Sequence, residues 1–125
     1  MTTTIYFFNG NNESSEKYYF EKEYRDDIVI KIDDLFYELY FFTQDSIEYE
    51  MTKDGYFSLP GLIILDSISL EKIIKSIKHL KQKGYFDNFK GTTELSQKNR
   101  FLHKWYENNL SLFNDKSLEI LEIKM

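Results

Sequence analysis

Hydrophobic and polar residues alternate along the first third of the chain in a way that predicts β-strands. The segment Thr2–Phe8 is rich in β-branched and aromatic residues and is expected to form a strand. Residues 9–15, NGNNESS, have the composition of a turn or loop. The next segment, Glu16–Tyr24, fits either an irregular strand or a short helix, and we favour the strand.

The clearest pattern is a β-hairpin over Asp27–Phe42. Isoleucines alternate with other residues before Asp33 and Asp34, and apolar residues alternate along the segment that follows. Aspartate tolerates turn conformations, so Asp33 and Asp34 are predicted to form the turn. The second strand is apolar on nearly both faces and is therefore expected to be central in the sheet.

The segment Thr43–Gly55 admits two interpretations. As a strand, its apolar residues alternate with acidic residues. As a helix, Thr43 or Asp45 caps its start and Gly55 ends it. We expect the helix, because its start and stop signals agree.

The only proline, Pro60, precedes Gly61 and four aliphatic residues, Leu62 to Leu65. Proline donates no hydrogen bond to a β-ladder, and glycine permits a sharp bend. We therefore interpret the pair as a bend that leads into a short buried strand, and not as a functional loop.

Two helices are predicted in the second half of the chain. Leu70–Lys83 has aliphatic residues three and four apart on one face, with Ser69 as a plausible N-cap. Glu94–Leu110 has a second apolar face, and Ser117–Met125 is expected to be a closing strand. These elements predict a single α+β domain over residues 1–125, with a mainly antiparallel sheet of about five strands and two principal helices packed on it.

Charge is unevenly spread along the chain. The formal net charge is −5, but residues 1–60 hold 13 acids and 5 bases, a net charge of −8, whereas residues 61–125 hold 8 acids and 11 bases, a net charge of +3. An acidic half repels nucleic-acid phosphates and suits a basic protein partner. The alternative is a solvated acidic surface that keeps a small protein in solution.

The cysteine content and the N-terminal sequence bear on the cellular location of the protein. The chain has no cysteine, which excludes disulfides, thiolate metal sites and cysteine nucleophiles. Its first 16 residues show neither the basic nor the apolar region of a signal peptide, and its longest apolar run is too short to cross a bilayer. We expect a cytoplasmic protein that does not contact a membrane.

Residues that could carry catalysis are few. The two histidines, His79 and His103, lie in no recognisable catalytic motif, and His79 falls opposite the apolar face of its helix. Carboxylate pairs such as Asp33 and Asp34 occupy turns, where charges are usually solvated. We therefore expect no catalytic residue, no metal and no cofactor, and we do not expect an enzyme.

Two alternative functions remain open at this point. One is a small metal-dependent hydrolase that uses the Asp/Glu cluster. The other is a nucleic-acid-binding accessory protein that uses the basic residues of the lysine-rich helix. That helix carries Lys72, Lys75, Lys78, Lys81 and Lys83.

A series of short motifs begins at the end of the segment Thr43–Gly55. An aromatic pair, Tyr56-Phe57, precedes Pro60-Gly61 and the aliphatic Leu62 to Leu65; the helix then opens with Ser-Leu-Glu-Lys-Ile at 69–73, and Gly-Tyr-Phe follows it at 84–86. Over Asp54–Phe89, less than a third of the chain, this pattern resembles small bacterial immunity proteins of contact-dependent growth inhibition and related polymorphic toxin systems.

The resemblance implies a bacterial protein without chemistry of its own. It would bind and neutralise the C-terminal toxin domain of a secreted effector by stoichiometric contact, at the active site or at an exosite. Such toxins are often nucleases, whose basic surfaces an acidic inhibitor would match. Tyrosines interleaved with acids are typical of binding hot spots. The expected toxin-binding residues are Glu16, Tyr18, Glu21, Glu23, Tyr24, Asp26, Asp27, Asp33 and Asp34.

Overall fold

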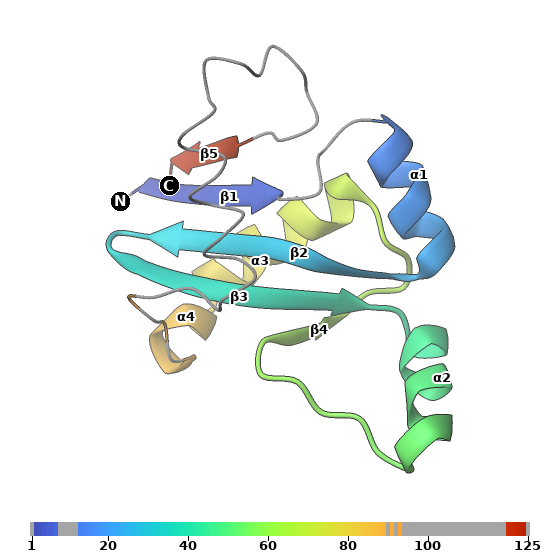
Figure 1. The fold of residues 1–125 in the computed structure, drawn as a ribbon. Helices are drawn as coiled ribbons and strands as arrows, with labels where there is room; N and C mark the ends of the chain where they lie inside the picture. Colours follow the sequence, from blue (N-terminus) through green and yellow to red (C-terminus); the bar gives the residue numbers. More distant parts are fainter. Residues whose placement is uncertain (1, 8–12, 90, 92, 94–119, 125) are drawn as a thin grey trace.

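The structure, a computed structural model, describes residues 2–7, 13–89, 91, 93 and 120–124. In chain order its elements are β1 (Thr2–Phe7), α1 (Glu13–Lys22), β2 (Tyr24–Ile32), β3 (Leu35–Phe42), α2 (Gln44–Asp54), β4 (Leu62–Ile64), α3 (Leu70–Gln82), α4 (Tyr85–Asn88) and β5 (Ile120–Lys124). One sheet with the order β4-β3-β2-β1-β5 organises these elements (Figure 1). The predicted α+β class is confirmed.

The sheet is mixed. The pairings β1–β2, β1–β5 and β2–β3 are antiparallel, as expected, whereas β3 and β4 run parallel. The predicted hairpin is confirmed, since Ile32 pairs with Leu35 across a turn in which Asp33 has a φ of 54°. Strand β3 lies between β2 and β4, as its apolar sequence predicted.

The main core lies between the sheet and α3, which crosses behind the strands (Figure 1). Ile73 and Ile77 of α3 are fully buried and belong to the same cluster as Ile30, Leu39 and other residues of β1, β2 and β3. The predicted helix is confirmed, and so is its cap, because the Ser69 hydroxyl accepts a hydrogen bond from the backbone N–H of Lys72. Apolar residues at helical spacing therefore fix α3 on the sheet.

Helix α2 forms where the capping signals placed it. The Thr43 side chain accepts a hydrogen bond from the backbone N–H of Ser46, and Gly55 ends the helix with a φ of 79°. No atom lies within 4 Å of where a Gly55 side chain would begin, so glycine is needed there only for its backbone conformation. The helical interpretation of Thr43–Gly55 is thus confirmed.

The strand favoured for Glu16–Tyr24 is wrong. Helix α1 begins at Glu13, inside the predicted loop, and runs to Lys22, while Tyr24 already belongs to β2. Tyr19 is its only apolar residue described as buried, so α1 has no repeating apolar stripe. Its acidic first turn and basic last turn were the available signals.

The Pro60-Gly61 bend is confirmed, but the strand after it is not buried. Leu62 donates its backbone N–H to the Leu59 carbonyl across the turn, and Gly61 has a φ of 79°. Strand β4 lies at the edge of the sheet, and Ile64 is 61% exposed. The aliphatic run therefore supplies an edge strand, which agrees with the placement of proline next to it.

The structure tests the predictions for the C-terminal part of the chain only in part, because residues 94–119 lie outside the described residues. The strand predicted for Ser117–Met125 is confirmed over Ile120–Lys124, which form β5, and its other residues lie outside the described residues. The helix predicted for Glu94–Leu110, together with His103, lies outside the described residues, and four helices stand in the described part where two principal ones were expected overall. Within the described residues, no helix has the length and apolar character needed to cross a membrane.

Candidate protein-binding surface

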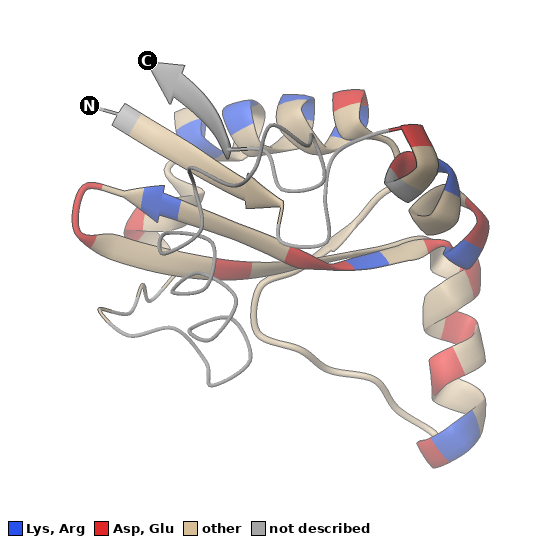
Figure 2. Cartoon of the chain, turned by 45° about the horizontal axis from the view of Figure 1, so that its top comes forward, with Lys and Arg blue, Asp and Glu red and all other residues tan. Residues whose placement is uncertain are grey.

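The residues predicted to bind a toxin do not form one surface. Asp33 and Asp34 are exposed at the β2–β3 turn, at one end of the sheet, whereas α1 and the start of β2 lie at the other end (Figure 1, Figure 2). Tyr18 is 51% exposed and Glu21 is exposed, both on α1. The structure therefore separates the turn from the rest of the predicted set.

Asp27 has to be removed from the predicted surface, because it is fully buried. A register shift between Arg25 and Ile28 bends β2 at this point, and Asp27 accepts hydrogen bonds from the Arg25 Nε at 2.7 Å and Nη2 at 3.1 Å. The Arg25 guanidinium also lies 4.8 Å from the Phe7 ring centre and 4.5 Å from that of Tyr19. This pair serves the fold, since it joins α1 to β1 and β2.

Glu16 also has a structural contact. Its carboxylate accepts a hydrogen bond from the backbone N–H of Leu70, at 3.1 Å, although the two residues are 54 positions apart. Leu70 is the first residue of α3, whose N-terminal N–H groups lack partners within the helix. Glu16 thus holds α1 against the start of α3, and the charge favours that helix end.

Two of the remaining predicted residues, Glu23 and Tyr24, line a concave surface. The third, Asp26, is partly exposed on β2 and lies close enough to Tyr40 to raise the pKa of that residue. A cavity of about 490 Å³ lies between α2 and the junction of α1 with β2. Its walls include Glu23 and Tyr24 from the predicted set, together with Lys22 and residues of α2. The residues from α2 are Asp45, Ser46, Tyr49, Glu50 and Lys53. We call residues 22–24 and 44–54 the acidic end; they hold five acids and two bases.

Helix α2 contributes the side chains that sequence reasoning had not assigned to the interface. Of its residues only Ser46 is buried, while Asp45, Glu48, Tyr49 and Asp54 are exposed. Tyr49 is 64% exposed. The alternation of acids with Tyr and Met in the sequence was the available signal, since an amphipathic helix in the core would need a stronger apolar stripe.

The acidic end already accommodates an ammonium group from its own chain. Lys53 Nζ lies 3.3 Å from both carboxylate oxygens of Glu50 and 4.9 Å from the ring centre of Tyr49. Carboxylate and aromatic ring together are the environment that a lysine or arginine side chain prefers. The chemistry of this surface therefore suits basic side chains of a partner.

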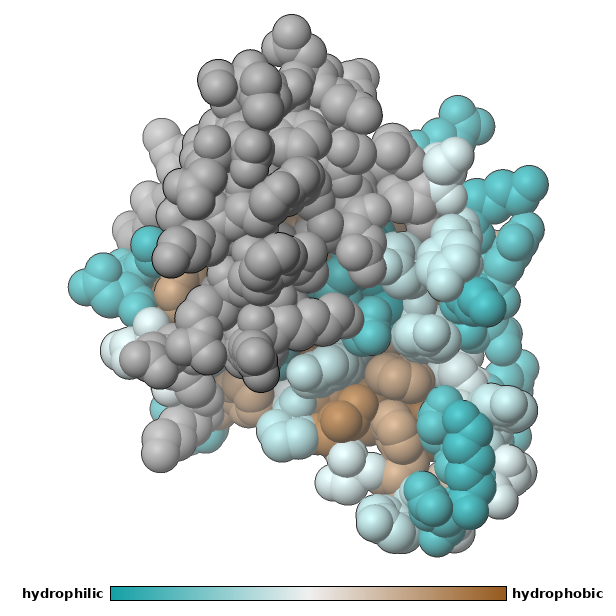
Figure 3. Space-filling model, viewed as in Figure 1, coloured by the Kyte–Doolittle hydropathy of each residue, from teal (hydrophilic) through white to brown (hydrophobic). Residues whose placement is uncertain are grey.

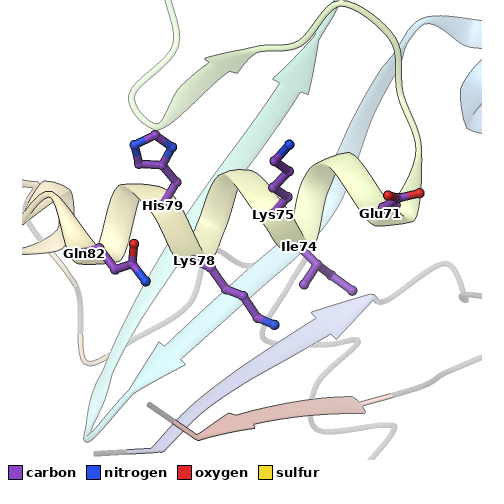
Figure 4. A pocket seen from close by; sticks show the side chains of 6 residues that line it. All are labelled: Glu71, Ile74, Lys75, Lys78, His79 and Gln82. Atoms are coloured by element: carbon purple, nitrogen blue, oxygen red, sulfur yellow. The ribbon is translucent and has the colours of Figure 1, made fainter.

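The lysine-rich helix presents a different surface. Lys72 donates hydrogen bonds to Asp66 and Ser67, and Lys81 donates one to the Thr3 hydroxyl, so both hold neighbouring segments. Lys75 and Lys78 line a shallow groove of about 540 Å³ on the outer side of α3. Figure 4 shows Lys75 and His79 on one side of the helix axis and Ile74 and Lys78 on the other.

Two pKa shifts describe the local electrostatics. Partial burial, followed by the negative charges of Glu38 and Asp26, raises the pKa of Tyr40. The hydrogen bond from Lys72, and then its positive charge, lower the pKa of the exposed Asp66. Tyr40 therefore lies in a negative environment on β3, whereas Asp66 is balanced by the basic helix.

Within the described residues, no group of three or more His, Cys, Asp or Glu side chains is arranged to hold a metal ion. Comparison with protein-family models, with curated proteins and with solved structures found no match to this chain.

Proposed function

We propose that this protein acts by stoichiometric binding, as an immunity protein that docks and neutralises a basic toxin domain. The observation that carries the proposal is the acidic end, whose residues include five acids and two bases. Its cavity is lined by three of those acids, both bases and the tyrosines Tyr24 and Tyr49. Tyrosine and charge in a concavity are typical of binding hot spots. The motifs of Asp54–Phe89 give independent support, because they resemble immunity proteins of polymorphic toxin systems.

Electrostatics gives this surface its preference for a basic protein. Negative charge concentrated on one end of a molecule speeds encounter with a positive partner and disfavours polyanions. A nuclease toxin carries a basic surface for its own substrate, which would pair with the carboxylates of α2. The protein would then block the toxin by covering that surface or a site beside it.

The test is co-expression with the toxin domain encoded by the neighbouring open reading frame. We expect the wild-type protein to restore growth and to elute with the toxin domain as a one-to-one complex from a sizing column. A matched variant, Glu48→Lys with Asp54→Lys, changes two exposed residues of α2. It should fold normally and rescue less well at low expression. Failure of the wild-type protein to rescue and to form a complex would overturn the proposal.

A further inference from the structure

An apolar patch lies beside the acidic end, on the face of the sheet opposite the main core. Phe41 is fully buried in the core, so its neighbours Tyr40 and Phe42 project from the other face. The parallel pairing sets Leu62 opposite Tyr40 and Ile64 opposite Phe42, so these two β4 residues share that face. The ring of Phe57 lies 5.0 Å from that of Phe42 and completes what we call the apolar patch.

The apolar patch is open to solvent at its outer edge. Ile64 is 61% exposed, while Leu62, Tyr40 and Phe57 are partly exposed. Figure 3 shows apolar side chains gathered at the surface between the sheet edge and α2. The Tyr24 ring stacks on Phe42 at 5.4 Å, so a residue of the acidic end connects directly to the patch. The two surfaces are therefore continuous.

Exposed isoleucine on an edge strand is unfavourable unless something covers it. Proteins usually protect sheet edges with charge, proline or a covering element, because an apolar edge promotes aggregation. Here Pro60 protects the approach to β4, but Ile64 itself is left at the surface. An apolar group rimmed by polar residues is typical of an interaction site.

The charges around the apolar patch determine what kind of group can cover it. Glu38 and Asp26 lie near enough to Tyr40 to raise its pKa, and α2 adds four acids against one base on the adjoining side. Nucleic acid and anionic lipid would be repelled at this rim. A segment with lysine or arginine on either side of an apolar residue is complementary in both respects.

We infer that the apolar patch receives an apolar side chain from a lysine- or arginine-rich segment of the partner protein, and that it is the anchor of an interface whose rim is the acidic end. This inference rests on the proposed function for the identity of the partner. It assigns different tasks to the two surfaces: the charged rim controls the association rate, and the apolar patch controls how long the complex lasts.

A synthetic peptide tests the surface itself. The probe is a peptide with Leu-Phe at its centre and three lysines on each side; one control has Ser-Ser at the centre and another has glutamate in place of lysine. We expect the probe to shift backbone amide resonances of residues 40–42 and 62–65, with a dissociation constant near or below about 1 mM. Neither control peptide should saturate.

Matched variants locate the contact. Ile64→Lys should weaken the probe at least about tenfold, because it places a positive charge in the apolar patch. Phe20→Ser removes another exposed apolar side chain, 56% exposed on α1, and should change binding less than about twofold. Both variants should keep the urea-unfolding midpoint of the wild-type protein, since both sites are largely exposed.

Three results would overturn the inference: no saturable binding at millimolar probe, equal binding by the serine control, or equal weakening by the two variants. Shifts at residues 62–65 that depend on protein concentration alone would show that a second copy covers the patch, which also contradicts it. Failure of toxin rescue by the wild-type protein contradicts the proposed function instead. The peptide experiment separates these two failures, because it does not use the toxin.

Discussion

At the bend of β2, Asp27 is fully buried and its carboxylate accepts two hydrogen bonds from Arg25, whereas on α2 Glu48 and Asp54 are exposed. Both regions look alike in the sequence, as acids beside aromatic and aliphatic residues. The difference teaches that the acidity of the N-terminal half serves two purposes. One group of carboxylates holds elements together, and the other gives one end of the molecule its charge.

The largest expected effect comes from breaking the buried pair. Asp27→Ala leaves the Arg25 guanidinium buried without its carboxylate and should lower the free energy of unfolding by about 3–5 kcal/mol. Urea denaturation of the two proteins measures the difference. The double variant Arg25→Met with Asp27→Leu should regain most of the loss, because no charge is then buried. A cost below about 1 kcal/mol for Asp27→Ala would contradict the structural role.

Gly55 and Gly61 have the same φ of 79°. An alanine at Gly55 would meet backbone strain alone, whereas an alanine at Gly61 would also collide with neighbouring atoms. Gly55→Ala should cost about 1–2 kcal/mol, because only the left-handed backbone opposes it. Gly61→Ala should cost roughly a further 1–3 kcal/mol, since its added carbon would lie 2.5 Å from the Glu38 carbonyl oxygen. Thermal or urea unfolding measures both, and equal costs would contradict the close packing of the bend.

A smaller effect is expected where α1 meets α3. Glu16→Gln weakens the hydrogen bond to the Leu70 N–H and removes the negative charge from the start of α3, so it should cost about 0.5–2 kcal/mol. Glu13→Gln, at an exposed position of the same helix, is the control and should cost less than about 0.5 kcal/mol. If the control costs as much as Glu16→Gln, the contact between the two helices does not stabilise the fold.

The smallest effect tests the charge around the apolar patch. The pKa of Tyr40 is raised above 10.0 in the folded protein, so stability linked to this group is complete below pH 10.0 and is lost as the pH rises through the folded pKa. Glu38→Gln should lower the pKa of Tyr40, because it removes a neighbouring negative charge. Titration of the Tyr40 ring resonances measures the shift. Glu48→Gln should leave it unchanged, and an unchanged pKa in Glu38→Gln would place Glu38 away from the patch.

Local signals predicted much of the fold. The hairpin followed from alternation on both sides of Asp33 and Asp34, and α2 followed from Thr43 and Gly55, because capping depends on nearby residues. Helix α1 was missed since it buries chiefly Tyr19, which leaves no apolar period to detect. The parallel pairing of β3 with β4 was missed because a three-residue strand carries no information about its partner.

The candidate site was predictable only in part. Acidity beside tyrosine in residues 16–27 pointed to Glu23 and Tyr24 among others, and these two residues line the cavity of the acidic end. Asp27 lies within the register shift of β2 and is buried. The alternation of apolar and polar residues does not predict where such a shift occurs. The apolar patch depends on residues from β3, β4 and the loop before it, and it appears only when the strands are paired.

The most direct test of the account is the association rate of this protein with the proposed partner, a toxin domain encoded by a neighbouring reading frame, measured by stopped-flow fluorescence at several salt concentrations. The account predicts that Glu48→Lys with Asp54→Lys slows association about tenfold or more at low salt and that the difference shrinks as salt is added. Equal rates for variant and wild type at low salt would contradict the claim that the acidic end guides a basic partner.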